Sequence, residues 1–268
     1  MATVYVAGVD LEATLGFQCT DTGAEHDGAV SVPGELEIPG VRGAIFVGPD
    51  RVPVREFTIT GFLTGANQAA VRTNFHKLKA LVGSEDVTVR VADWTTVDIT
   101  ARCIRFDGQN YPRQSRANSL NEKEMHVAMT FRAANPYWRD TSNTVVAFTT
   151  SAVAMPQGTA PGEAVLESAV GAATTPTITC KDYLGATLWT ATLASQGASE
   201  KYRITTTPAV MTIEKWNGSA WVVSDASLTA GVFPKPLPSS PTGYQSSTWP
   251  TLQATSGSWT ATYKKQWR

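Results

Sequence analysis

A single amphipathic helix, in a chain otherwise patterned for β-strands, is the feature that most restricts the fold. The helical pattern begins after Asn67, which can cap the first turn, and ends at Gly83. Its apolar stripe, with the spacing i, i+4, i+7 and i+11, consists of Val71, Phe75, Leu78 and Val82. The sequence therefore predicts a mainly β protein with one α-helix.

Alternating apolar and polar residues around this helix predict a β-barrel or β-sheet for the first half of the chain. Strands are expected at residues 4–6, 55–63, 87–91, 97–106 and 126–133. The alternation slips near Cys103, which predicts a β-bulge. A polar, turn-rich loop runs from Gly108 to Lys123 and is long enough to indicate a function.

The second half of the chain predicts an all-β sandwich, because it contains short strand-like segments and no helical pattern. The turn Asn217-Gly218 between Trp216 and Trp221 is a strong hairpin signal. The expected strands are at residues 177–180, 188–193, 202–205, 210–214 and 258–267.

The distribution of charge predicts a boundary between two domains. Residues 1–140 contain 14 of the 22 Lys and Arg residues and 17 of the 23 Asp and Glu residues. A run rich in Thr and Ser follows Asp140, as expected of a linker. We expect one domain at residues 1–140 and a second at residues 141–268.

Side chains for catalysis or metal binding are scarce. No histidine has a second ligand at metal-binding spacing; the three are His26, His76 and His126. The pairs Asp10/Glu12 and Glu35/Glu37 have the i, i+2 spacing that puts two carboxylates on one strand face, as a glycosidase would require. Exposed strands commonly carry such pairs, so we expect no enzyme, no metal and no cofactor.

Tryptophans in the second half allow two interpretations. Trp216, Trp221, Trp249 and Trp259 either fill the core of a sandwich or present rings on which sugars stack. A core position is the favoured interpretation. If a sugar platform exists, Trp216 and Trp249 are the candidates, because both lie beside turns.

Net charge and hydropathy exclude several partners. A formal charge of −1 and a pI near 6.3 give no general attraction to nucleic acid. No stretch has the roughly 20 mostly apolar residues that a membrane-spanning helix requires. Three widely spaced cysteines, Cys19, Cys103 and Cys180, predict buried free thiols and synthesis in a reducing compartment.

The order of the segments carries a resemblance to a known family. A strand ending Phe57–Leu63 precedes the helix, and the first domain closes with Phe131-Arg132-Ala133-Ala134-Asn135-Pro136-Tyr137-Trp138. The second domain opens with Gly171–Cys180 and closes with Ala261–Trp267. This order resembles the distal tail proteins of siphophages, the bacteriophages with long non-contractile tails. Asn135 stands where the family more often has Asp.

The resemblance implies a structural protein of the virion, synthesised in the host cytoplasm. It implies a homo-hexameric ring at the tail tip, formed by an N-terminal β domain with one helix, and a galectin-like β-sandwich as the second domain. The ring would join the tail tube protein to the tip or baseplate hub proteins. DNA would pass through the lumen without specific binding.

A closed ring of this kind needs two different complementary patches on each subunit. We expect the interface on the outward face of the helix, at Arg72 and Lys79, and on the Gly108–Lys123 loop, at Arg113 and Arg116. The alternative function is a carbohydrate- or receptor-binding tail module. A polymerising tail-tube protein and a wall hydrolase are the remaining alternatives.

Overall fold

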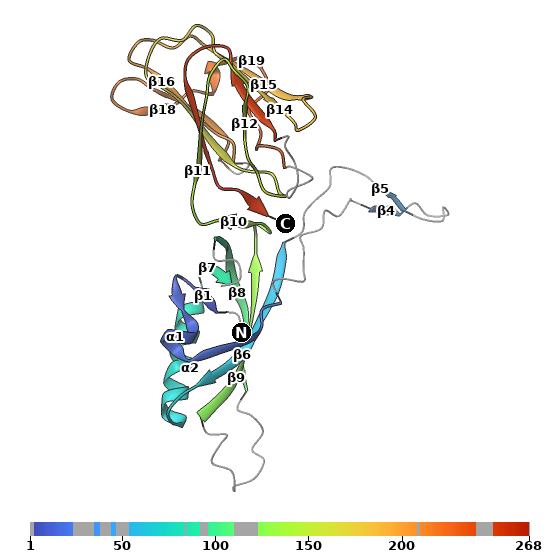
Figure 1. Ribbon diagram of the computed structural model, residues 1–268, viewed down its shortest axis with the longest axis vertical. Helices are drawn as coiled ribbons and strands as arrows, with labels where there is room; N and C mark the ends of the chain where they lie inside the picture. The colour runs from blue at the N-terminus through green and yellow to red at the C-terminus, as the bar shows by residue number, and fades with distance from the viewer. Residues whose placement is uncertain are drawn as a thin grey trace. The chain divides into compact units, whose positions relative to one another are not determined.

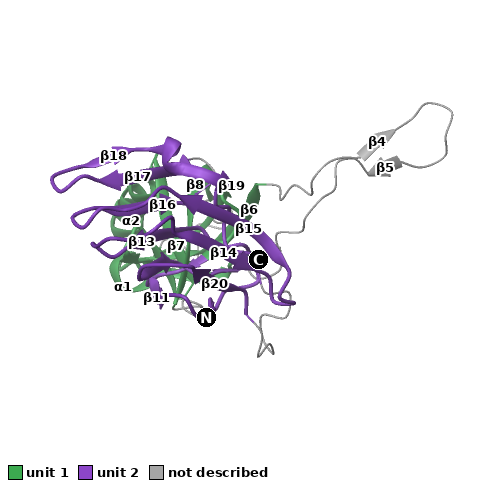
Figure 2. Ribbon diagram, turned by 90° about the horizontal axis from the view of Figure 1, so that it is seen from above, with its two compact units in different colours: residues 1–138, 268 green, residues 139–267 purple. Residues whose placement is uncertain are grey.

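The computed structural model describes residues 3–23, 35–37, 44–46, 54–83, 85–91, 96–109, 123–207, 210–239 and 249–267. The chain divides into two units, Met1–Trp138 (unit 1) and Arg139–Trp267 (unit 2), which are coloured differently in Figure 2. The strand β10 (Trp138–Asp140) contains the boundary along the chain. The mainly β fold class predicted from the sequence is confirmed.

Unit 1 is an antiparallel sheet with the strand order β2-β1-β7-β8-β9-β6-β3. A separate two-stranded pair is formed by β4 (Glu35–Glu37) and β5 (Ala44–Phe46). The strands of the main sheet are β1 (Val4–Val6), β2 (Val9–Asp10), β3 (Phe17–Asp21), β6 (Arg55–Thr64), β7 (Asp86–Val91), β8 (Val97–Gln109) and β9 (Glu124–Ala133).

The predicted helix is α2 (Gln68–Val82), which packs on β6, β8 and β9. The Asn67 side chain caps it by accepting a hydrogen bond from the Ala70 amide at 2.9 Å. Val71, Leu78 and Val82 are buried, as the periodicity predicts. Phe75 is only half-buried, and its ring lies 5.1 Å from that of Phe106 on β8.

A second, short helix, α1 (Leu11–Leu15), lies next to α2 (Figure 1) and was not predicted. Asp10 caps α1 through Oδ1, and Gly16 ends it in the left-handed conformation at φ 64°. The expectation that Asp10 and Glu12 share one strand face is therefore wrong. The chain leaves β2 after Asp10, so Glu12 lies in the first turn of α1.

The predicted β-bulge is confirmed. Along the pairing of β8 with β9, Cys103 lies opposite Phe131, whereas Arg105 and not Ile104 lies opposite Thr130. The extra residue displaces Ile104, which is half exposed, from the alternation. Cys103 itself is half-buried and donates its thiol to the Arg105 carbonyl.

Unit 2 is a β-sandwich of two antiparallel sheets, which confirms the predicted architecture of the second half. The six-stranded sheet has the order β11-β21-β13-β16-β17-β18, and the five-stranded sheet has the order β12-β20-β14-β15-β19. The strands of the first are β11 (Thr144–Phe148), β13 (Ala164–Ser168), β16 (Lys201–Thr205), β17 (Thr212–Trp216), β18 (Trp221–Val223) and β21 (Trp259–Tyr263). Those of the second are β12 (Val153–Ala154), β14 (Thr177–Lys181), β15 (Thr187–Leu193), β19 (Leu228–Gly231) and β20 (Thr251–Ala254).

Alternate residues of both sheets form the core of unit 2. Leu166, Ile204 and Trp259 from the six-stranded sheet and Ile178 and Leu252 from the five-stranded sheet belong to one buried cluster. A 3₁₀ turn (Asp225–Ser227) precedes β19, and β22 (Gln266–Trp267) follows β21. The burial of alternate residues leaves the opposite side of the six-stranded sheet facing solvent.

The hairpin predicted at Asn217-Gly218 connects β17 to β18. Trp216 pairs directly with Trp221, and Gly218 takes a positive φ of 100°. The Asn217 side chain accepts hydrogen bonds from the amides of Ser219 and Ala220, which closes the turn. Both tryptophans are therefore held on one face of the hairpin.

Candidate functional site

The solvent-facing side of the six-stranded sheet, called here the outer face, collects most of the polar and charged side chains of that sheet. Along each strand the residue after a buried one projects to this side, so Glu167 follows the buried Leu166 and Thr260 follows the buried Trp259. The outer face consists of Val145, Ala147, Val165, Glu167, Lys201, Arg203, Thr205, Thr212, Glu214, Trp216, Trp221, Val223, Thr260 and Thr262.

Strand register aligns the charged members of the outer face. Glu167 lies opposite Thr260 on one side and opposite Arg203 on the other, and Arg203 lies opposite Glu214. Directly opposed side chains on one face are within contact distance. The three strands β13, β16 and β17 thus place one carboxylate on each side of the Arg203 guanidinium.

The ion pairs follow this register. Glu167 accepts hydrogen bonds from Lys201 Nζ at 2.5 Å and from Arg203 Nε at 3.3 Å. Arg203 Nη1 lies 3.9 Å from Glu214 Oε2. These side chains keep about a quarter to a third of their surface exposed, so each isolated pair contributes little, but the network holds its members in place. Two cations and two carboxylates leave the cluster with no net charge.

Trp221 packs against both cations of the cluster. Its ring centroid lies 3.9 Å from Arg203 Cζ and 4.9 Å from Lys201 Nζ. The Trp216 ring meets Trp221 edge-on at 5.6 Å. The aromatic surface beside the cluster is thus largely covered by neighbouring side chains, which reduces its use as a stacking platform.

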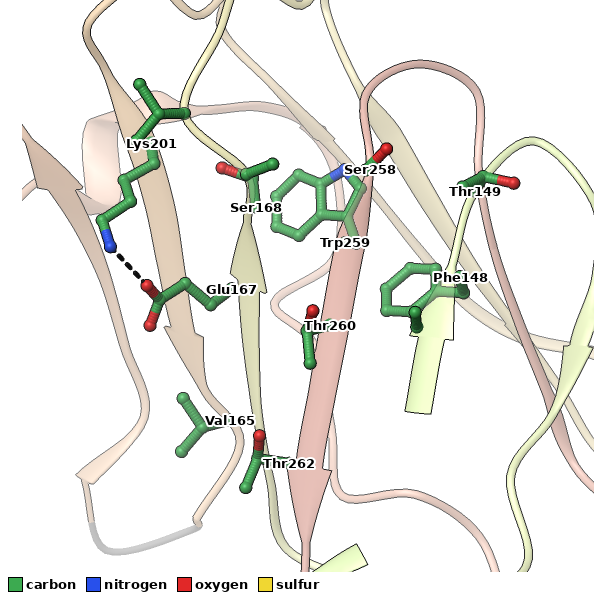
Figure 3. A pocket seen from close by; sticks show the side chains of 13 residues that line it. Phe148, Thr149, Val165, Glu167, Ser168, Lys201, Ser258, Trp259, Thr260 and Thr262 are labelled. Carbon is green, nitrogen blue, oxygen red and sulfur yellow. Dashed lines mark hydrogen bonds and ion pairs between the residues drawn. The ribbon is translucent and has the colours of Figure 1, made fainter. Parts of the chain in front are cut away.

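A hollow of about 500 Å³ opens over the outer face beside Glu167 and Lys201 (Figure 3). Thr260 and Thr262 on β21 project into it next to Val165 and Glu167 on β13. Loops at one end contribute Thr149, Ser258, Ala169 and Val170. Volumes of this order are typical of small-molecule sites. Sequence analysis missed this site, because its residues come from segments far apart along the chain.

The structure separates the two tryptophans expected to form a sugar platform. Trp216 ends β17 in the six-stranded sheet, whereas Trp249 lies just before β20 of the other sheet. Both are half-buried, and the ring partner of Trp216 is Trp221. Trp259 fills the core, as the favoured interpretation expects, whereas for Trp216 and Trp221 that interpretation is wrong, because both lie on the outer face.

The residues expected at a subunit interface lie in unit 1. Arg72 and Lys79 are seven residues apart on α2, and both are exposed. Seven residues are about two helical turns, so the two cations share one face. Arg113 and Arg116 lie outside the described residues, as does most of the loop that carries them.

Titratable groups of the described residues show no cluster suited to metal binding. Burial raises the pKa of the Cys180 thiol to about 12, with a smaller contribution from Asp182, and burial also raises the pKa of Cys103. None of the three cysteines is in a disulfide, as predicted, although Cys103 is only half-buried. Among the described helices, none is long and apolar enough to cross a membrane.

Comparison with known proteins gives a full-length structural match. No family model matches the chain, and no curated protein matches it by sequence. A crystal structure of the SPP1 Dit protein, reported as a paradigm of the hub adsorption apparatus in phages that infect Gram-positive hosts, aligns with a TM-score of 0.71 and 15% identity. The alignment covers 99% of each chain.

The chain has the fold of SPP1 Dit. Structures of the phage P2 baseplate in its activated conformation, with Ca and with Sr, align more distantly, at TM-scores of 0.47 and 0.48 and 8% identity. The SPP1 Dit match spans both units, so it covers the first sheet with α2 as well as the sandwich. At the level of fold, it confirms the resemblance to siphophage distal tail proteins.

Proposed function

We propose that this protein is a structural hub of a phage tail tip, where six copies form a ring. The ring joins the tail tube protein to the tip or baseplate proteins that meet the host, and the protein is located in the virion. The observation that carries this proposal is the match to a phage hub protein along 99% of both chains. The same neighbour, described as part of a hub adsorption apparatus, supports a structural role in place of an enzymatic one.

Unit 1 has features suited to ring contacts. Its sheet ends in short strands, β2 at one edge and β3 at the other, and its exposed helix face carries Arg72 and Lys79. A closed ring repeats one contact between two different patches. The two edges of the sheet are formed by different strands, and the charged face of α2 is a third surface. Unit 1 therefore offers the unlike patches that a ring requires.

The native mass of the purified full chain tests the proposal. Light scattering after size exclusion, with negative-stain images of the same peak, is expected to show a discrete hexamer with a central hole. Open tubes of variable length would contradict a hub and favour a polymerising tail-tube protein. A monomer at every concentration would contradict a ring that assembles by itself.

A further inference from the structure

We propose that the hollow on the outer face of unit 2 binds a neutral saccharide through the hydroxyls of Thr260 and Thr262 and the carboxylate of Glu167. This site differs from the tryptophan pair considered above. It adds a binding activity to the structural role and does not depend on ring formation, because all its residues belong to one unit of one chain.

Several hydroxyl groups that line the hollow have no hydrogen-bond partner among the described residues. Thr260 and Thr262 project from the same side of β21, and neither hydroxyl bonds to another described residue. The side-chain hydroxyls of Ser258 and Thr149, at the end of the hollow, likewise bond to no other described residue. Hydroxyls that both donate and accept are suited to a ligand whose own groups do the same.

The ion pairs beside the hollow favour a neutral ligand over a charged one. Glu167 is already paired with Lys201 and Arg203, and Arg203 also lies near Glu214. An anion would have to compete with Glu167 for its cations, and a cation would have to compete for the carboxylates. A neutral hydroxyl can instead donate to a remaining lone pair of Glu167 without breaking either pair.

The walls of the hollow are preorganised. Ser168 donates to Gln196 Oε1 at 3.0 Å and accepts from the Tyr202 amide at 2.8 Å, so this wall is fixed from behind. Glu167 is held by two donors from the neighbouring strand. A site whose polar groups are already oriented loses less entropy when a ligand binds.

Aliphatic surface completes the lining. Val165 lies on β13 opposite Thr262 and two residues before Glu167, and Val170 is 59% exposed at the end of the hollow. Sugars present C–H faces as well as hydroxyl edges, so they match a lining that alternates small apolar and hydroxyl groups. A purely apolar ligand would leave the threonine hydroxyls without partners.

Calorimetric titration of the full chain tests the proposal with defined probes: lactose, maltotriose and N,N′-diacetylchitobiose. Sialyllactose serves as the anionic counterpart of lactose. At least one neutral probe is expected to bind with a single site per chain. The double variant Thr260→Val/Thr262→Val is expected to bind about ten-fold more weakly, because two hydrogen bonds are lost while the shape is kept.

The matched control is Thr205→Val/Thr212→Val. These threonines lie opposite each other on the same sheet, on β16 and β17, and do not line the hollow. The control should bind like the wild type. Failure of all three neutral probes to bind would overturn the proposal. So would unchanged binding by Thr260→Val/Thr262→Val, which would place the sugar elsewhere, and so would tighter binding of sialyllactose than of lactose.

Discussion

Arg203 lies over the indole of Trp221, with its Cζ atom 3.9 Å from the ring centroid, while its nitrogen atoms reach toward Glu167 and Glu214. The contact joins the hairpin strand β18 to β16, although β17 separates the two strands in the sheet. The guanidinium is thereby held between one aromatic face and two carboxylates. Of the residues that contact Trp221 in this way, Lys201 also lines the hollow.

Replacing Trp221 by Leu should lower the free energy of unfolding by about 1 kcal/mol, because the ring that covers both cations is lost. Arg203→Lys should lower it by a smaller amount, since the charge is kept but the flat guanidinium is not. Urea unfolding at low and high salt measures both changes. A Trp221→Leu variant as stable as the wild type would show that the stack contributes nothing.

Gly61 occupies a position in β6 where no side chain fits. A Cβ atom there would lie 2.4 Å from the Gln18 carbonyl oxygen and 2.7 Å from the ring of Phe17. Gly61→Ala should therefore destabilise the protein by about 1–3 kcal/mol, as overpacking does. The control Glu124→Ala changes an exposed residue of the adjacent strand β9 and should leave the unfolding midpoint nearly unchanged.

The carboxylate of Glu200 provides a test of pH dependence. Its hydrogen bonds with Lys215 Nζ at 2.8 Å and with the Gly197 amide at 2.7 Å lower the pKa of Glu200. A pKa lower in the folded state means that the pair stabilises the fold above the ordinary pKa of Glu. That contribution disappears as the pH falls through the lowered value.

Lys215→Met should raise the pKa of Glu200 toward its ordinary value, with the Gly197 amide still limiting the change. Carbon-detected NMR titration of the carboxyl groups reports this pKa directly. Lys201→Met is the control, because it removes a cation from Glu167 instead. It should leave the pKa of Glu200 unchanged. An identical Glu200 curve in Lys215→Met and wild type would refute the assignment.

Thiol labelling should distinguish the three cysteines. Burial raises the pKa of Cys180 to about 12, and Cys19 is only 5% exposed, so both should resist a thiol reagent in the native state. Cys103, half-buried at the bulge, should react slowly and first. All three should react after denaturation, and mass spectrometry of the labelled peptides counts them. Rapid native labelling of Cys180 would contradict its burial.

Assembly should depend on the exposed face of α2 if this face contributes to the ring. Arg72→Glu/Lys79→Glu reverses two exposed charges and is expected to shift the native mass from a hexamer toward smaller species. The control Lys181→Glu/Lys235→Glu makes the same change of charge in unit 2 and should assemble normally. A ring unaffected by the first double variant would move the interface to another surface of unit 1.

Local patterns predicted much of the fold. The cap at Asn67, the stripe of Val71 and Leu78, the bulge after Cys103 and the turn at Asn217-Gly218 were all predicted correctly. Each depends on residues close together in sequence, whose spacing or turn chemistry is enough. The five-residue helix α1 was missed, because it is too short to show a helical period.

The sequence by itself determined the class of the fold, since the period of apolar residues separates strands from helices and inside from outside. Only the tertiary structure decided which strands become neighbours. Register across β21, β13, β16 and β17 brings Thr260, Glu167, Arg203 and Glu214 into one row, although almost one hundred residues separate the first from the second. The alternation within a strand gives the face of each side chain, whereas cross-strand pairing gives its neighbours, and that pairing is a property of the folded chain.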